Sequence, residues 1–152
     1  MNDPAAGDAA YRAPDLTLVG AEHVRRYRET GGEVGYEWNG VTALLLTTTG
    51  RTTGEPRTSA LIFGADDDRL VVIASQGGAP THPQWYRNLL AQPRVEVQVK
   101  DRRIAAVART AEGAERERLW GLMVGLWPNY DAYQERTDRS IPVVVLEPAE
   151  EG

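Results

Sequence analysis

Apolar residues recur along most of this chain in short runs, and turn-forming residues separate one run from the next. Residues 94–100 alternate most clearly, because three valines fall on one face and charged or polar side chains on the other. This alternation is typical of a half-buried antiparallel strand. The dipeptide Asn39-Gly40 lies between the runs at residues 33–38 and 41–48, so it predicts a tight hairpin turn between two strands.

Further apolar runs predict strands at residues 58–64, 69–75, 103–110 and 141–146. Apolar residues at helical spacing predict helices at residues 16–30, 82–91 and 112–126, and a short helical turn at residues 129–136. Pro128 ends the third of these helices, because proline cannot donate a backbone hydrogen bond.

The predicted strands have no strand–helix–strand rhythm, so a parallel doubly wound sheet is not expected. We predict a mainly β (α+β) fold, a small antiparallel barrel of about six strands with two or three helices at its ends. Residues 16–152 are expected to form this single domain. Residues 1–15 are rich in alanine, aspartate and proline, which is typical of a disordered terminus.

Composition narrows the class of protein. The 152 residues suit one domain, and a formal net charge of −5 argues against a general nucleic-acid binder. With no cysteine and two histidines, neither thiol chemistry nor a metal site is expected. No apolar run reaches the roughly 18 residues of a membrane span, and no signal peptide is visible. We expect a cytoplasmic protein, with peripheral membrane contact through the helix at 16–30 as the alternative.

The most informative stretch is residues 44–58, where an apolar strand runs into a glycine-bounded turn. The turn carries Arg51 and Arg57 among several threonines. Backbone N–H groups in such a turn can point outward together, and two fixed positive charges beside them favour an anion. The stretch is not a P-loop, because no Gly-Lys-Ser/Thr follows and no helix opens there. We predict a site for the anionic tail of a cofactor, with exposed turn charges as the alternative.

The chain has no evident catalytic dyad, so a cofactor is expected to supply any difficult chemistry. Trp85 and Tyr86 are adjacent in a predicted helix and therefore point in different directions, which leaves at least one to cover a flat ligand. Tyr130 and Tyr133 follow the helix break, and their spacing is equally compatible with lining a pocket and with core packing.

Three sequence blocks combine these features. They read Leu-Leu-Thr-Thr-Thr-Gly-Arg-x-x-Gly-x-Pro-Arg at 45–57, Ala-Ser-x-Gly-Gly-Ala-x-x-x-Pro-x-Trp-Tyr-x-Asn-Leu at 74–89, and Trp-Pro-x-Tyr-x-x-Tyr-Gln-x-x-Thr-Asp-Arg-x-Ile-Pro-Val-Val-Val-Leu-Glu-Pro at 127–148. In this order and spacing the chain resembles the deazaflavin-dependent nitroreductase family. These actinobacterial enzymes use reduced coenzyme F420, and one of them activates bicyclic nitroimidazole prodrugs. The resemblance covers about residues 41–148, and the N-terminal third lies outside it.

The resemblance implies a split β-barrel with F420 in a groove. The residues matched to contacts with the phosphate and the oligoglutamate tail are Arg51, Thr52, Thr53, Arg57, Thr58, Ser59, Ala60 and Leu61. Those matched to the deazaflavin ring are Ile73, Ala74, Ser75 and Gln76, and the remaining cofactor contacts are Gln84, Trp85, Tyr86, Arg87 and Asn88. By the same resemblance, Tyr130 and Tyr133 face the substrate. Tyr133, Tyr130 and Ser75 are therefore the candidate catalytic residues.

The resemblance also implies the reaction, in which hydride passes from F420H2 to a small planar electrophile such as a quinone, an activated enone or a nitroaromatic, without a metal. The alternatives are a non-catalytic F420-binding or carrier protein, and a related split-barrel oxidoreductase that uses FMN or haem. A homodimer is a further expectation, because split barrels often pair through sheet faces.

Three positions depart from the family. Gln76 stands where the family often has lysine, which should weaken tail binding or alter the preferred tail length. Ile62 and Trp127 stand where the prodrug-activating member has tyrosine, so prodrug activation does not follow from the resemblance.

Overall fold

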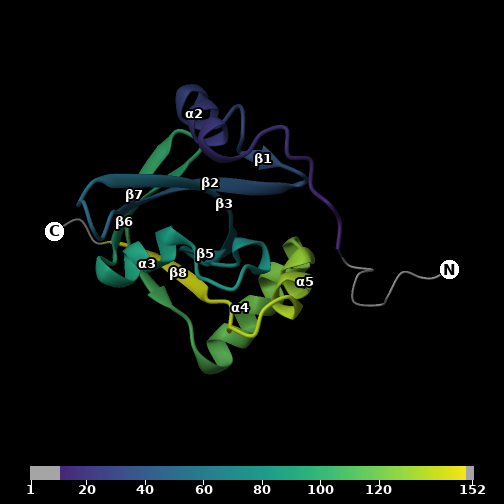
Figure 1. Ribbon diagram of the computed structural model, residues 1–152. Coiled ribbons are helices and arrows are strands. Elements are labelled where there is room, and N and C mark those ends of the chain that lie inside the picture. Colours follow the sequence, from purple (N-terminus) through teal and green to yellow (C-terminus); the bar gives the residue numbers. More distant parts are fainter. Residues whose placement is uncertain (1–10, 150–152) are drawn as a thin grey trace.

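The computed structural model describes residues 11–149 and is dominated by one antiparallel sheet that curls into a barrel (Figure 1). Within these residues the sheet has eight strands. They are β1 (Glu37–Trp38), β2 (Val41–Thr49), β3 (Pro56–Ile62), β4 (Gly64–Asp66), β5 (Arg69–Ile73), β6 (Arg94–Val99), β7 (Arg102–Thr110) and β8 (Val143–Pro148). The order is β1-β2-β6-β7-β8-β5-β4, and β3 pairs with β2 outside this path.

The helices lie around the barrel. Helix α2 (Gly20–Thr30) lies above strand β2 in Figure 1, and α3 (Gln84–Ala91), α4 (Gly113–Leu126) and α5 (Asn129–Glu135) lie below that strand, with a 3-10 turn η1 (Gln76–Gly78) after β5. Every strand pair in the described part is antiparallel, so the predicted class, a mainly β barrel with added helices, is confirmed.

The sheet has one strand more than the seven runs predicted as strands, because one of those runs forms two strands. The run at 58–64 is interrupted at Phe63, so β3 pairs with β2 whereas β4 pairs with β5. Gly64 lies under α4, where an added Cβ would come within 2.7 Å of Met123 Sδ. A larger residue at this position would force the side chains of Met123 and Leu126 to move.

The N-terminal predictions need two corrections. The helix begins at Gly20 rather than at residue 16, because Val19 is extended (φ −147°, ψ 163°) and the chain turns into the helix at Gly20. The predicted strand at 33–38 is only Glu37–Trp38, because Gly32 and Gly35 have positive φ angles and form a turn. The hairpin at Asn39-Gly40 is confirmed, since both residues have positive φ and Trp38 pairs with Val41.

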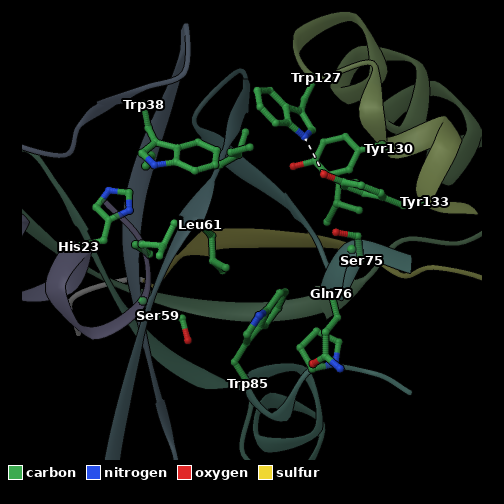
Figure 2. Close-up of a pocket in the computed structure, with 18 of the residues that line it drawn as sticks. His23, Trp38, Ser59, Leu61, Ser75, Gln76, Trp85, Trp127, Tyr130 and Tyr133 are labelled. Carbon is green, nitrogen blue, oxygen red and sulfur yellow. Dashed lines mark hydrogen bonds between the residues drawn. The ribbon is translucent and has the colours of Figure 1, made fainter. Parts of the chain in front are cut away.

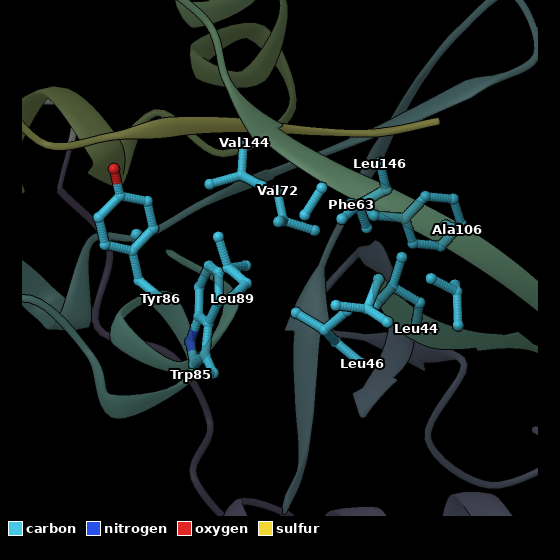
Figure 3. Packing of buried hydrophobic residues seen from close by; sticks show 14 residues of the cluster. Leu44, Leu46, Phe63, Val72, Trp85, Tyr86, Leu89, Ala106, Val144 and Leu146 are labelled. Carbon is cyan, nitrogen blue, oxygen red and sulfur yellow. The ribbon is translucent and has the colours of Figure 1, made fainter. Parts of the chain in front are cut away.

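Two hydrophobic clusters share the strands β5 and β8. Val72 and Val144 point into the barrel, where they pack with Leu44, Leu46 and other residues (Figure 3). The alternate residues of the same strands point to the other side, beneath α4 and α5, and these are Val71, Ile73, Val143 and Val145. Strands that are apolar on both faces arise because each face is covered by another layer.

The N-terminal end of the described chain is held by hydrogen bonds to two asparagine side chains. Arg12 exchanges two backbone hydrogen bonds with the side chain of Asn129, and Asp15 does the same with Asn39. These contacts fix residues 11–15 against α5 and the β1–β2 turn. Disorder is predicted for residues 1–15, of which residues 1–10 lie outside the described residues.

Candidate functional site

A cavity of about 470 Å³ opens where the edge of β3 faces the end of β5. Its walls come from α2, β1, β3, the loop after β5, α3 and α5 (Figure 2). The lining residues are Val19, Gly20, His23, Trp38, Ala43, Ser59, Ala60, Leu61, Ile62, Ile73, Ser75, Gln76, Gly77, Pro83, Gln84, Trp85, Trp127, Tyr130 and Tyr133. Such a pocket, mostly apolar with a few polar groups, suits a flat organic ligand.

The open edge of β3 gives this cavity a backbone wall. In the described part of the chain β3 pairs with β2 alone, so its other edge has no strand partner. Alternate N–H and C=O groups on that edge remain available for hydrogen bonds. Ser59, Ala60 and Leu61 carry this edge along the cavity.

A second hollow of about 290 Å³ continues from the first. Both are lined by Ser59, Gln84 and Trp85, so the two spaces adjoin at these three residues. The other residues of the second hollow are Gly50, Arg51, Thr52, Thr53, Arg57 and Asn88. The predicted glycine-bounded turn therefore lines a hollow, and its residues 51–57 remain exposed to solvent.

Arg51 is held in place by neutral acceptors from α3. Its Nη1 donates to Asn88 Oδ1 at 2.8 Å and its Nη2 donates to Gln84 Oε1 at 2.7 Å. The Arg51 backbone N–H also donates to Asn88 Oδ1, at 3.2 Å. Asn88 is buried and its own amide donates to Thr48 Oγ1, so the arginine is anchored to the sheet.

Within the described part of the chain, no carboxylate pairs with the positive charges of this hollow. Among the ion pairs of residues 11–149, neither Arg51 nor Arg57 has a carboxylate partner. Two arginines beside threonine hydroxyls and a turn backbone give this hollow the chemistry that suits an anion.

The opposite end of the cavity is aromatic. Trp38 and Trp127 lie with ring centroids 5.7 Å apart, and His23 stacks on Trp38 at 6.2 Å. Trp127 Nε1 donates to Tyr133 Oη at 3.5 Å, the dashed line in Figure 2. Because Tyr133 Oη accepts this hydrogen bond, its own hydroxyl proton is free to point toward a ligand.

Tyr130 differs from Tyr133 in its surroundings. Its side chain is buried, and this burial raises the pKa of its hydroxyl well above the usual range. Tyr130 therefore stays neutral at any ordinary pH. Its ring packs edge-on against Tyr133 at a centroid distance of 6.1 Å and helps to fix that side chain.

Most of the predicted site residues meet around the two hollows, but four do not line them. Tyr86 points into the barrel core, where its hydroxyl bonds Thr110 Oγ1 at 2.9 Å. Thr58 Oγ1 bonds Thr47 Oγ1, Ala74 is buried in the core, and Arg87 lies outside both hollows. Of the adjacent pair Trp85 and Tyr86, it is Trp85 that faces the cavity.

Several lining residues escaped the sequence-based prediction. Val19, Gly20, His23 and Trp38 come from the N-terminal third, which the resemblance did not cover. The one available signal was the hairpin turn at Asn39-Gly40, which brings Trp38 beside Val41. The sequence marks Trp127 as a departure from the family but does not predict its place in the cavity wall, where its indole faces Trp38.

The fold defines the broader class, the split β-barrel. A solved structure described as an F420H2-dependent reductase superposes with a TM-score of 0.65 at 42% identity, covering 69% of this chain and 93% of that one. Another, described as a domain-swapped dimer, gives 0.68 at 39% identity and covers 83% and 95% of the two chains. A haem storage protein from Vibrio cholerae, at 16% identity and a TM-score of 0.58, shares the fold alone.

The particular family follows from sequence. The chain belongs to the F420H2-dependent quinone reductase family, whose model matches residues 19–148. An F420H2-dependent quinone reductase of Mycobacterium tuberculosis is 41% identical over 128 residues, which cover 82% of this chain and 86% of the relative. The match begins at residue 19, so the family likeness includes most of the N-terminal third that the sequence blocks left out.

Proposed function

We propose that this chain is an F420H2-dependent oxidoreductase that reduces a small planar acceptor such as a quinone, an activated enone or a nitroaromatic. Membership of the family supports the cofactor and the reaction class. The observation that carries the assignment to these residues is the joining of an anion-binding hollow to an apolar, aromatic-walled cavity. F420 has the matching parts, a flat ring and a long anionic tail.

The residues present fit this cofactor. Arg51 and Arg57 have no carboxylate partner among the described residues, and they lie where a phosphate and carboxylates need cations. The backbone edge of β3 can bond the polar edge of a ring, and Trp85 offers a flat face at the junction of the two hollows. When bound, the reduced deazaflavin supplies a hydride and needs no metal.

The chain's own residues would orient the reactants and stabilise charge. Trp85 and the β3 edge position the ring, and the aromatic end receives the acceptor, so proximity lowers much of the barrier. The Tyr133 hydroxyl, whose lone pair is engaged by Trp127, can donate to an acceptor oxygen as negative charge develops there. Ser75 also lines this wall and is a second candidate donor, whereas buried Tyr130 supports Tyr133.

The test is a titration of the purified chain with F420, followed by tryptophan fluorescence, with FMN in parallel. We expect F420 to quench the fluorescence saturably and FMN not to. We also expect the protein to oxidise F420H2 when the soluble naphthoquinone menadione is added. F420 binding without turnover of quinones, enones or nitroaromatics would favour a carrier protein. Binding of FMN alone would overturn the cofactor assignment, and the arginine hollow would then hold the FMN phosphate.

We also propose two associations. A homodimer is supported by the relative described as a domain-swapped dimer, and light scattering on the purified chain tests it.

Peripheral membrane contact is supported by the exposed Leu16 and Val19, because Val19 also lines the cavity. Co-sedimentation with phospholipid vesicles tests it, and Leu16→Ser with Val19→Ser should abolish it. No helix in the described part is both long enough and apolar enough to span a membrane.

A further inference from the structure

The loop after β5 has an unusual backbone conformation. Gln76, Gly77 and Gly78 have φ angles of 47°, 64° and 84°. Glycine adopts such angles freely, but the Cβ of Gln76 makes this conformation unfavourable. Gln76 and Gly77 both line the cavity. Two hydrogen bonds within the loop, from Gly78 N–H to the Ser75 carbonyl at 2.9 Å and from Ala79 N–H to the Gln76 carbonyl at 3.0 Å, are supplemented by contacts from outside it.

Arg139 supplies those contacts, although it comes from the motif Thr-Asp-Arg to which no function has been given above. Its Nε donates to the carbonyl of Ala79 at 2.8 Å, its Nη1 to that of Ala74 at 3.2 Å, and its Nη2 to that of Ser75 at 2.6 Å. Nη1 also lies 2.9 Å from His82 Nδ1. One guanidinium thus ties both ends of the loop together.

The nature of these partners suggests a role beyond charge pairing. Within residues 11–149 Arg139 has no carboxylate partner, and its acceptors are three carbonyls and an imidazole nitrogen. Burial lowers the pKa of Arg139, so the fold keeps this cation in place at an electrostatic cost. A planar fork of five N–H donors can reach acceptors in several directions, which an ammonium on one atom cannot.

The bonds to Arg139, together with the bond from Gly78 N–H to the Ser75 carbonyl, hold two peptide units in one orientation. In a trans peptide unit the carbonyl and the N–H point in opposite directions, and no cis peptide occurs among the described residues. Turning the carbonyls of Ala74 and Ser75 toward Arg139 therefore turns the N–H groups of Ser75 and Gln76 away from it. Neither N–H has a hydrogen-bond partner in the described part of the chain, and both residues line the cavity.

We propose that Arg139 is a positioning residue that aims the N–H groups of Ser75 and Gln76 into the cavity and polarises them toward the electron-rich edge of the bound ring. A cation at the carbonyl end of a peptide unit makes its N–H a stronger donor. The ring gains electron density when it is reduced, so these donors stabilise the reduced cofactor more than the oxidised one. This role rests on the function proposed above.

The same arginine links the ring wall to the acceptor end. Gln134 of α5 donates from Nε2 to the Arg139 carbonyl at 2.7 Å, and α5 carries Tyr133. Gly78 lies so close to α5 that an added Cβ would come within 2.6 Å of the Tyr133 carbonyl oxygen. The loop, Arg139 and Tyr133 thus form one connected unit beside the cavity.

The experiment measures the dissociation constants of F420 and F420H2 for the wild type, Arg139→Gln and Arg116→Gln. Arg116 is the matched control, because it also donates to a main-chain carbonyl, that of Ile141 at 2.7 Å, but lines neither hollow. We expect Arg139→Gln to lower the preference for F420H2 over F420 about tenfold. For two electrons this equals a shift of about 30 mV in the potential of the bound cofactor. Arg116→Gln should keep the wild-type ratio.

The outcomes separate this inference from the proposed function. If the wild type does not bind F420, both the proposed function and this inference are overturned. If the wild type binds F420 and Arg139→Gln binds both forms more weakly by the same factor, the arginine is merely structural and the inference fails. If Arg139→Gln does not fold, Arg139→Lys replaces it. Its ratio should fall several-fold because lysine cannot reach the separated carbonyls, and an unchanged ratio overturns the proposal.

Discussion

The two ends of the cavity are built in different ways. The anion hollow comes from one continuous turn, residues 50–57, and from α3 that supports it through Asn88 and Gln84. The aromatic end comes from segments far apart in the chain, with His23 and Trp38 on one side and Trp127 and Tyr133 on the other. The cationic groups of the first end lie on one continuous turn, whereas the second end depends on how the whole barrel closes. We therefore expect mutations to separate cofactor affinity from acceptor selectivity.

The largest effect should come from Arg51→Ala. A hydrogen bond to a charged group contributes about 1.5–3 kcal/mol, so the affinity for F420 should fall about ten- to hundredfold. The deazaflavin ring lacking its phosphate and tail should bind as it does to the wild type. Arg102→Ala, an exposed arginine on β7 away from both hollows, is the matched control. Equal losses for F420 and for the ring alone would contradict the division into two ends.

A smaller effect, on the acceptor and not on the cofactor, is expected for Trp127→Leu. Loss of the indole that faces Trp38 should raise the acceptor KM about tenfold, because an aromatic pair contributes about 0.5–1.5 kcal/mol beyond area burial. The dissociation constant of F420 should stay within about twofold of the wild type by fluorescence titration. Trp120→Leu is the control, since Trp120 lines neither hollow. Weaker F420 binding by Trp127→Leu alone would mean that the aromatic end also holds the cofactor.

Within the aromatic end, Tyr133→Phe should lower kcat by a factor of about three to ten with unchanged F420 binding. The lost group is one neutral hydrogen-bond donor, whose net contribution is about 1 kcal/mol. Tyr130→Phe should leave kcat nearly unchanged, because that hydroxyl is buried and stays protonated. Steady-state oxidation of F420H2 by menadione measures both. Unchanged kcat in Tyr133→Phe would remove this hydroxyl from the mechanism.

The smallest effect concerns pH and His82. Burial, followed by the charges of Arg139 and Arg87, lowers its pKa below the usual value of 6.5, and the ring of Tyr86 packs against it at 5.0 Å. The unfolded chain then binds a proton more readily than the folded one, so this contribution to stability is present above about pH 6.5 and is lost as the pH falls through the lowered pKa. The melting temperature of His82→Asn should fall less between pH 7.5 and pH 5.5 than that of the wild type.

The two ends of the cavity also differ in how well the sequence predicts their residues. The turn with Arg51 and Arg57 could be recognised because its glycines, arginines and preceding strand are contiguous. The directions of Trp85 and Tyr86 could not be decided, because helical spacing does not tell which of two neighbours faces a core that distant strands complete. His23 and Trp38 could not be placed because their contact with the pocket depends on the close approach of α2 to Gly35, whose added Cβ would meet His23 at 2.9 Å.

The alternation of β5 and β8 between two hydrophobic clusters has a consequence for how this molecule opens. Val72 belongs to the barrel interior and its neighbours Val71 and Ile73 to the layer under α4 and α5, so neither cluster can lose these strands without the other. The whole sheet should behave as one cooperative unit in native-state hydrogen exchange. Amides of β5 and β8 should exchange only by global unfolding, with one common free energy of opening on both sides of the wall that carries the cavity.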